Sequence, residues 1–123
     1  MIEAYSINKT VTANSPVSFD NVTIQKGCTV TQSGDANFNL NKCGVYSVCV
    51  NATAAAETTL QLYKDGLALP QAQSTGTSLA FSTLVQVNHN NCGCCCSSPV
   101  NLQVMNTTAG TLDNINITIS KLC

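Results

Sequence analysis

Apolar and polar residues alternate with a period of two along most of the chain. The clearest case is Asn114–Ser120, where three isoleucines alternate with Asn, Thr and Ser. Because successive side chains of a strand point to opposite faces of a sheet, this pattern predicts a strand with one buried face. The same alternation occurs in Val100–Val104 and in Leu60–Leu62, which leads into the hairpin-turn signal Lys64-Asp65-Gly66.

No stretch of the chain shows a helical period, an internal repeat or a linker. Short strands rich in β-branched residues and separated by turns favour a sandwich or barrel. The sequence therefore predicts one domain over residues 1–123, an all-β jelly-roll sandwich of about ten short antiparallel strands. The expected strands are Ala4–Thr12, Val17–Ile24, Cys28–Gln32, Phe38–Leu40 continuing through Gly44–Ala52, Thr58–Tyr63, Leu67–Ala72, Ser78–Val87, Val100–Asn106 and Asn114–Leu122.

Charge is scarce in this sequence. Charged residues make up 9% of the 123 residues, and the formal net charge is −1. Binding to nucleic acid or anionic lipid needs clustered Lys and Arg, so we expect neither nucleic acid nor a membrane as a partner. Residues 1–5 show no positive region followed by an apolar one, and no later apolar run reaches membrane-spanning length.

Asn, Thr, Ser and Gln supply the polar surface in place of charge. Such a surface is common on robust extracellular β domains and viral particles, which favours an extracellular or virion location. Five Asn-x-Thr triplets begin at Asn8, Asn21, Asn51, Asn106 and Asn116. Because alternate strand positions supply such triplets naturally, we interpret these asparagines as surface residues of strands first, and as glycosylation sites only in a secreting eukaryote.

Two of the expected strands carry small or apolar residues on both faces. The faces turned away from the expected core carry six such residues in Gly44–Ala52 and Ser78–Val87, namely Val45, Ser47, Cys49, Ala80, Ser82 and Leu84. A sheet of this kind needs a second surface to bury against. These six residues are therefore candidate subunit contacts, and the alternative is a monomer with a slightly apolar sheet.

One segment of the chain resembles a known family. Phe38, Gly44 and Tyr46 match the Phe-x-x-x-x-x-Gly-x-Tyr signature of the globular heads of complement component and tumour-necrosis-factor-like proteins. Leu62–Gly66 resembles the strand and turn that follow in that family, and Ser120–Leu122 ends the chain where the last core strand of the family does. The resemblance implies a jelly roll that packs against two other copies about a threefold axis, which makes a homotrimer.

The two ends of the chain add to this resemblance. The N-terminal Tyr-Ser-Ile-Asn and the C-terminal Lys-Leu-Cys are similar to small stand-alone jelly rolls encoded by Gram-positive gut bacteria and their phages. The resemblance thus implies a module of that type.

Catalysis finds little support in the sequence. A catalytic site needs a base, a nucleophile and a charge-stabilising group in one pocket. The chain has one histidine, His89, and six acidic residues that are not spaced as a recognisable pair. His89 and Cys92 could form a nucleophile and base, but both lie in one polar loop without a third, orienting group. We therefore expect a protein that is not an enzyme.

The unusual chemistry of the chain is concentrated in His89–Pro99. This segment holds four of the eight cysteines, Cys92, Cys94, Cys95 and Cys96. In an oxidative interpretation, some of them pair with cysteines elsewhere in the chain or in another subunit, which the even total permits. In a metal interpretation, the spacing of Cys92 and Cys95 with His89 nearby suits zinc. A loop of free thiols is the third interpretation.

The family topology brings further cysteines toward this loop. If the chain follows the family jelly roll, the strand that starts near Cys43 and the strand that ends at Cys123 are antiparallel neighbours, and the Cys92–Cys96 loop returns to the same end. The resemblance therefore implies one cysteine-rich pole that holds candidate disulfide or metal residues.

These observations predict a non-enzymatic structural or recognition module. We expect a homotrimer without an obligatory cofactor, located on a virion as a capsid or tail decoration, or on a bacterial surface, where it meets a surface ligand or virion partner of unknown identity. The alternative is a cysteine-rich metal-binding protein that uses the Cys92–Cys96 loop on a jelly-roll scaffold, with zinc as the metal that thiolates and imidazole favour.

Overall fold

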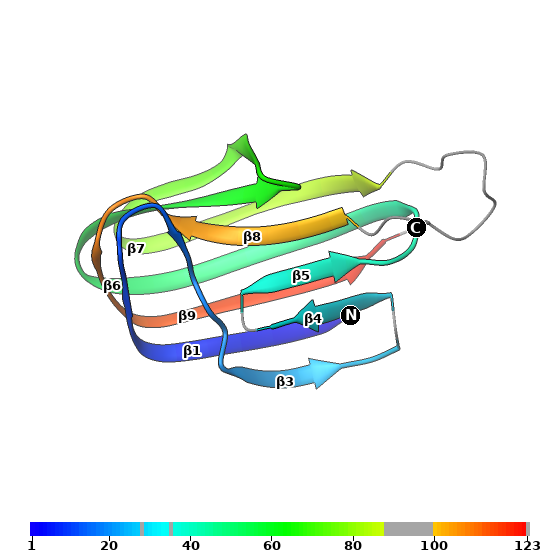
Figure 1. Ribbon diagram of the computed structural model, residues 1–123, viewed down its shortest axis with the longest axis horizontal. Coiled ribbons are helices and arrows are strands. Elements are labelled where there is room, and N and C mark those ends of the chain that lie inside the picture. Colours follow the sequence, from blue (N-terminus) through cyan, green and yellow to red (C-terminus); the bar gives the residue numbers. More distant parts are fainter. Residues whose placement is uncertain (28, 35, 88–99, 123) are drawn as a thin grey trace.

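A computed structural model describes residues 1–27, 29–34, 36–87 and 100–122 (Figure 1). Nine strands are present over these residues, namely β1 (Ile2–Val11), β2 (Ser15–Pro16), β3 (Asn21–Gln25), β4 (Val30–Ser33), β5 (Asn37–Leu40), β6 (Gly44–Lys64), β7 (Leu67–Val87), β8 (Val100–Asn106) and β9 (Gly110–Lys121). Within this part of the chain there is no helix that could cross a membrane.

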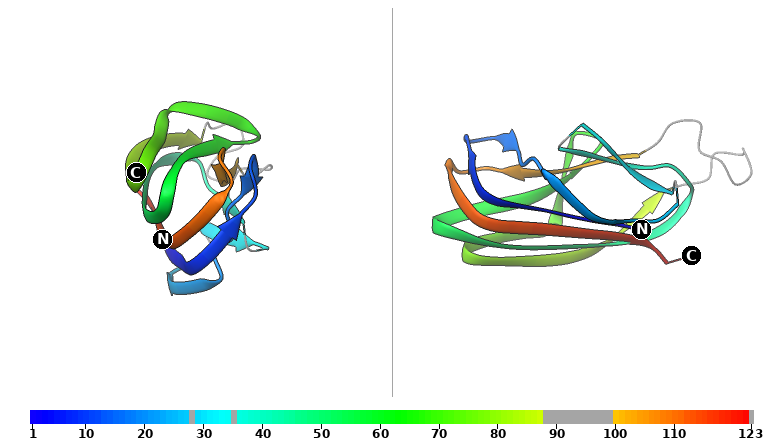
Figure 2. Two further views of the ribbon diagram at one scale, coloured as in Figure 1. Left: turned by 90° about the vertical axis from the view of Figure 1, so that its left-hand side faces the viewer. Right: turned by 90° about the horizontal axis from the view of Figure 1, so that it is seen from below.

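The strands form two layers that pack face to face, as the edge-on view in Figure 2 shows. The first layer contains β3, β1, β9, the first half of β6 and the second half of β7, in that order. The second layer contains β4, β5, β8, the second half of β6 and the first half of β7, with β2 paired to β8. Every pairing is antiparallel, which is the arrangement of a sandwich with one solvated face on each layer.

Strand β6 passes from the first layer to the second. It pairs with β9 from Tyr46 to Ala54 and with β8 from Leu60 to Lys64. The pairing registers shift between Thr53 and Thr58, where the strand bends. A bulge of this kind increases the local twist, so a single strand can serve both sheets of the sandwich.

A tight hairpin joins β6 to β7 at Asp65 and Gly66. Both residues have positive φ angles, 51° and 82°, and Lys64 pairs directly with Leu67. Two positive φ values define the hairpin turn whose twist matches that of antiparallel strands. The turn predicted from Lys64-Asp65-Gly66 is therefore confirmed.

The core lies between the two layers and is apolar. Phe19 and Phe38 pack edge to face with ring centroids 5.3 Å apart, a geometry that suits the charge distribution of aromatic rings. Tyr46 is fully buried, and its Oη donates to the carbonyl of Lys42 at 2.5 Å. The isoleucines predicted to share one face, Ile115, Ile117 and Ile119, are all fully buried.

The jelly-roll class is confirmed, but the expected strand lengths need correction. Strands β6 and β7 each run for 21 residues, and each joins two expected strands, so that residues 53–57 and 73–77 are also part of a strand. The alternation of side chains is interrupted there, yet the backbone stays extended because β6 and β7 pair with each other along both layers. Pairing between strands, and not local pattern, decides where a long strand ends.

The expected strand Val17–Ile24 begins only at Asn21. Residues Val17–Asp20 instead connect the two layers at one side of the sandwich. Val17 donates its backbone N–H to the carbonyl of Val104 in the second layer, at 2.7 Å, and Asp20 donates its backbone N–H to Ser6 Oγ in the first layer, at 2.8 Å. We call Val17–Asp20 the strap.

The interpretation of the Asn-x-Thr triplets as surface residues is wrong for one of the five. Asn8, Asn21, Asn51 and Asn116 are exposed, whereas Asn106 is fully buried. The Asn106 side chain accepts a hydrogen bond from Thr58 Oγ1 at 2.6 Å, beneath the bend of β6. A polar group that is buried in this way serves packing and cannot carry a glycan in the folded chain.

Candidate functional site

The six candidate subunit contacts share the outer face of the first layer. In the pairing of β6 with β7, Ser47 lies opposite Leu84, and Cys49 lies opposite Ser82. Directly opposed residues in an antiparallel pair place their side chains on the same face. The structure therefore brings together Val45, Ser47, Cys49, Ala80, Ser82 and Leu84, on the side away from the buried Tyr46 and Val48.

Strands β1 and β9 extend this face with residues that the sequence analysis did not select. Ser47 and Cys49 lie opposite Ser120 and Thr118 of β9 on their other side. Beyond β9, the same face carries Tyr5 and Ile7 of β1. Their position could have been found from Ile2 and Ala4, whose burial on the core side leaves Tyr5 and Ile7 facing outward.

We call this outer surface of β1, β9, β6 and β7 the first-layer face. Two of its large apolar side chains are well exposed, since Leu84 is 61% exposed and Ile7 is 59% exposed. Isolated apolar residues are common on protein surfaces, but these two lie on one continuous sheet with the half-buried Val45 and Tyr5. Such a face is a candidate contact surface for another macromolecule.

A shallow, open hollow of about 300 Å³ lies at the β6–β7 side of the first-layer face. Its lining consists of Cys49, Asn51, Ala80, Phe81 and Ser82. Phe81 is only partly buried and packs against the core from this edge strand. The hollow lacks a charged residue and a histidine among its lining residues, so its chemistry suits an apolar side chain better than a reacting substrate.

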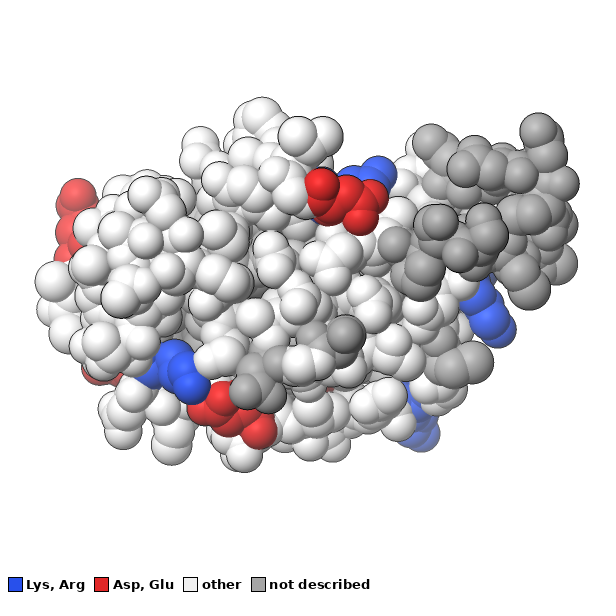
Figure 3. Space-filling model, viewed as in Figure 1, with Lys and Arg blue, Asp and Glu red and all other residues white. Residues whose placement is uncertain are grey.

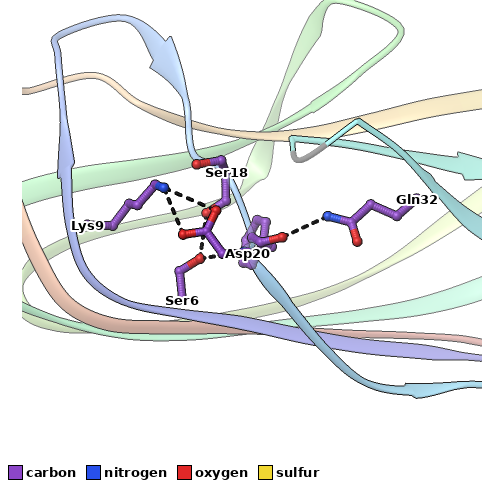
Figure 4. Close-up of polar contacts among 6 residues, drawn as sticks. Ser6, Lys9, Ser18, Asp20 and Gln32 are labelled. Carbon is purple, nitrogen blue, oxygen red and sulfur yellow. Dashed lines mark hydrogen bonds and ion pairs between the residues drawn. The ribbon is translucent and has the colours of Figure 1, made fainter.

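A cluster of polar groups joins the strap to β1, and its contacts hold the fold (Figure 4). The hydroxyl of Ser6 donates to the carbonyl of Ser18 at 2.8 Å and accepts from the backbone N–H of Asp20. Lys9 forms an ion pair with Asp20 at 2.8 Å. A nucleophilic serine needs a base to take its proton, whereas the proton of Ser6 is directed to a backbone carbonyl.

The structure describes two of the cysteines. Cys43 packs against the hydrophobic core, and Cys49 lies half-buried on the first-layer face. No disulfide bond joins these two residues to each other. Among the described residues there is also no group of three or more His, Cys, Asp or Glu side chains that could hold a metal ion.

The other candidate residues for a disulfide or metal site lie outside the described residues. These are His89, Cys92, Cys94, Cys95, Cys96 and Cys123. Neither the disulfide interpretation nor the metal interpretation is tested by the described part of the chain, and both stay predictions.

The described neighbours of the cysteines do gather at one end of the sandwich. Gly44, next to Cys43, pairs with Val87, which precedes the cysteine-rich segment. Leu122, next to Cys123, donates its backbone N–H to the carbonyl of Val45 at 2.7 Å. Val100, which follows the cysteine-rich segment, pairs with Leu40 at this same end. The strand arrangement on which the expected cysteine-rich pole depends is therefore present.

Comparison with solved structures places the fold among known jelly rolls. The globular domain of zebrafish complement 1qA protein superposes with a TM-score of 0.77 at 10% sequence identity, covering 99% of this chain and 96% of that one. Murine APRIL has a TM-score of 0.65 at 8% identity, covering 98% of both chains. Rabbit GITRL has a TM-score of 0.60 at 12% identity, covering 100% of this chain and 95% of its own.

The chain thus has the jelly-roll fold of the complement and tumour-necrosis-factor type, as the Phe38–Tyr46 signature predicts. No protein-family model matches the sequence, and no curated protein does either. At these low identities the likeness concerns the fold.

Proposed function

We propose that the protein is a homotrimeric, non-enzymatic recognition or structural module that acts on a virion or on a bacterial surface. The observation that carries this proposal is the first-layer face, a continuous sheet surface with Leu84, Ile7, Tyr5 and Val45 exposed or half exposed. Water contact with such a surface is unfavourable, so the face is best explained by a partner that covers it.

A second and third copy of the chain are the partners that best fit this face. The family resemblance of the Phe38–Tyr46 segment implies packing about a threefold axis, and the fold shared with the complement 1qA domain supports that implication. The low charge of the chain also favours assembly with further copies, because few charged side chains would be desolvated. The hollow beside Cys49 gives the face a recess into which an apolar side chain of a neighbour would fit.

The same surfaces support a role without catalysis. The polar groups of the strap are engaged in hydrogen bonds and an ion pair that hold the strap to β1. The hollow on the first-layer face offers a thiol, a hydroxyl and an amide without an acid or base beside them. Binding is thus the activity that these surfaces support best.

The location on a virion or bacterial surface rests on composition. The low charge and the high content of Asn, Thr and Ser resemble those of robust extracellular β domains. The two ends of the chain are similar to those of stand-alone jelly rolls from Gram-positive bacteria and their phages, which supports the same location. Neighbouring genes for capsid and portal proteins would favour the virion, and genes for spore or cell-wall proteins would favour the host surface.

The trimer is tested by light scattering on purified protein at micromolar chain concentration. We expect a mass close to three times the 12.9 kDa of one chain. Leu84→Glu and Val45→Glu should dissociate the assembly, because each places an unpaired charge in a contact that excludes water. Circular dichroism checks that each variant is still folded.

Leu67→Glu provides the matched control. Leu67 is 73% exposed and begins β7 at the hairpin, away from the first-layer face, so the same change in chemistry should leave the trimer intact. A wild-type protein that is monomeric under these conditions would refute the proposal. So would a folded Leu84→Glu variant that stays trimeric.

A further inference from the structure

The outer face of the second layer carries a set of paired amide side chains. Asn101 Nδ2 on β8 donates to Asn39 Oδ1 on β5 at 3.3 Å, and these two residues lie directly opposite each other. Gln103 Nε2 donates in the same way to Asn37 Oδ1. We call Asn37, Asn39, Asn101 and Gln103 the amide platform.

The hydrogen bonds within the amide platform fix its side chains but do not use up their capacity. Each amide carries two N–H donors and an oxygen that accepts two bonds, and each pair uses one donor and one acceptor site. The side chains are half-buried, so the remaining groups on their exposed parts are free to bind a ligand. Because the pairs already order these side chains, a ligand loses less conformational entropy in binding them.

Tyr63 adds an aromatic ring beside the amide platform. It lies directly opposite Gln103 in the pairing of β6 with β8 and is half exposed. A tyrosine ring offers an apolar face together with a polar hydroxyl. The Tyr63 ring and the amides of the platform therefore place an apolar surface beside hydrogen-bonding groups on neighbouring strands.

The four side chains of the amide platform and that of Tyr63 are uncharged. Figure 3 looks onto the second layer, and the described surface between its upper and lower charged groups is white, which marks uncharged side chains. Asp65 lies at the edge of the platform, where its carboxylate accepts the backbone N–H of Asn101 at 2.9 Å. An anionic ligand would therefore find no counter-charge among the platform side chains, whereas a neutral one loses no ionic hydration there.

Exposed large apolar residues are found in the first layer and, in the second layer, at Leu67 beside the β6–β7 hairpin. Those with exposed side chains in the described part of the chain are Met1, Ile7, Val22, Leu67, Leu84 and Leu122. None of them belongs to β5 or β8, the strands of the platform. Burial against another copy of the chain would desolvate amides and gain little apolar contact, so the platform is poorly suited to a subunit interface.

We propose that the amide platform and Tyr63 bind a neutral polysaccharide. Sugar hydroxyls both donate and accept hydrogen bonds, as the unused amide groups require, and the C–H faces of pyranose rings pack against aromatic rings. This inference gives a ligand class to the recognition role proposed above and rests on that role, although it does not depend on the trimer.

The proposal is tested by affinity electrophoresis through gels that contain one of three neutral polysaccharides, namely mannan, laminarin or hydroxyethyl cellulose. Heparin serves as the charged comparison. We expect the wild-type protein to be retarded by at least one neutral polysaccharide and not by heparin. Retardation by none of the three, or by heparin alone, would overturn the proposal. Light scattering on the same samples reports the trimer independently, so the two proposals fail separately.

Variants locate the binding surface. The double variant Asn39→Ala with Asn101→Ala removes both members of one pair, so neither amide is left without its partner. We expect this variant and Tyr63→Ala each to weaken binding by at least about tenfold, since several hydrogen bonds or a stacking contact are lost. Gln25→Ala removes an exposed amide from β3 in the first layer and should change binding less than about twofold. Unchanged binding by the folded double variant would overturn the assignment.

Discussion

The strap offers a direct test of how the two layers are held together. Ser6 is fully buried on β1, and its hydroxyl makes two hydrogen bonds to the strap backbone, one to the carbonyl of Ser18 and one from the N–H of Asp20, both at 2.8 Å. Ser6→Ala removes the hydroxyl and keeps the Cβ. Both backbone groups then lose their partner at a part-buried position, where water reaches them poorly.

The expected loss of stability follows from these two bonds. An unpaired backbone group costs about 1–3 kcal/mol when it is buried, and the lower end applies here because Asp20 itself is exposed. We therefore expect Ser6→Ala to lower the free energy of unfolding by about 2–3 kcal/mol. For a domain of this size, each kcal/mol corresponds to roughly 3–5 °C, so Tm should fall by about 6–15 °C.

The measurement is thermal and urea unfolding followed by circular dichroism. All variants are compared at one chain concentration, because assembly makes Tm depend on concentration. Asp20→Asn is the control, since it removes the charge that pairs with Lys9 but keeps the backbone N–H that donates to Ser6. This exposed ion pair should contribute only about 0.2–1 kcal/mol.

Two results would refute this reasoning. A loss below about 0.5 kcal/mol in Ser6→Ala would mean that water replaces the missing hydroxyl and that the strap is held by other contacts. An equal or larger loss in Asp20→Asn would mean that the Lys9–Asp20 ion pair, and not the buried hydroxyl, fixes the strap to β1.

The cysteine-rich pole and the absence of catalysis give two further predictions. In air-oxidised protein, mass spectrometry of non-reduced peptides should find at least one bridge that joins the Cys92–Cys96 loop to Cys43, to Cys123 or to another chain. Reduction should then lower the free energy of unfolding by about 2–4 kcal/mol without changing the fold. A loop organised by a metal would instead lose stability on addition of a chelator. Eight alkylatable thiols without bound zinc or iron would contradict both the disulfide and the metal interpretation. Screens for hydrolysis and group transfer should show no turnover, and activity abolished by His89→Ala would contradict that expectation.

The amino-acid sequence determines a large part of the fold through local pattern. Ile115, Ile117 and Ile119 are buried as their spacing of two residues requires, because a strand cannot turn one of them outward without turning all three. The Asp65-Gly66 turn follows from the positive φ angles that these two residue types tolerate. The outward position of Ser47 and Cys49 follows equally from the burial of Tyr46 and Val48.

Only the tertiary structure decides which faces meet and which strands continue. Alternation along a strand assigns residues to two faces but does not say which layer a segment joins, so the passage of β6 between layers through Thr53–Thr58 is not visible in the pattern. Asn106 begins an Asn-x-Thr triplet that is typical of a strand surface, yet strand pairing places it beneath the bend of β6 with Thr58 as its hydrogen-bond partner. This hydrogen bond across the fold outweighs the preference of the amide side chain for contact with water.

The first-layer face and the amide platform differ in how far the sequence predicts them. The first-layer face could be predicted from β6 and β7, because each strand shows apolar residues on both sides in its own sequence. The amide platform could not, since Asn39 and Asn101 are 62 positions apart and each looks like an ordinary surface residue by itself. Their pairing depends on the register between β5 and β8, which is a long-range property of the sheet and is fixed only when the core beneath it has packed.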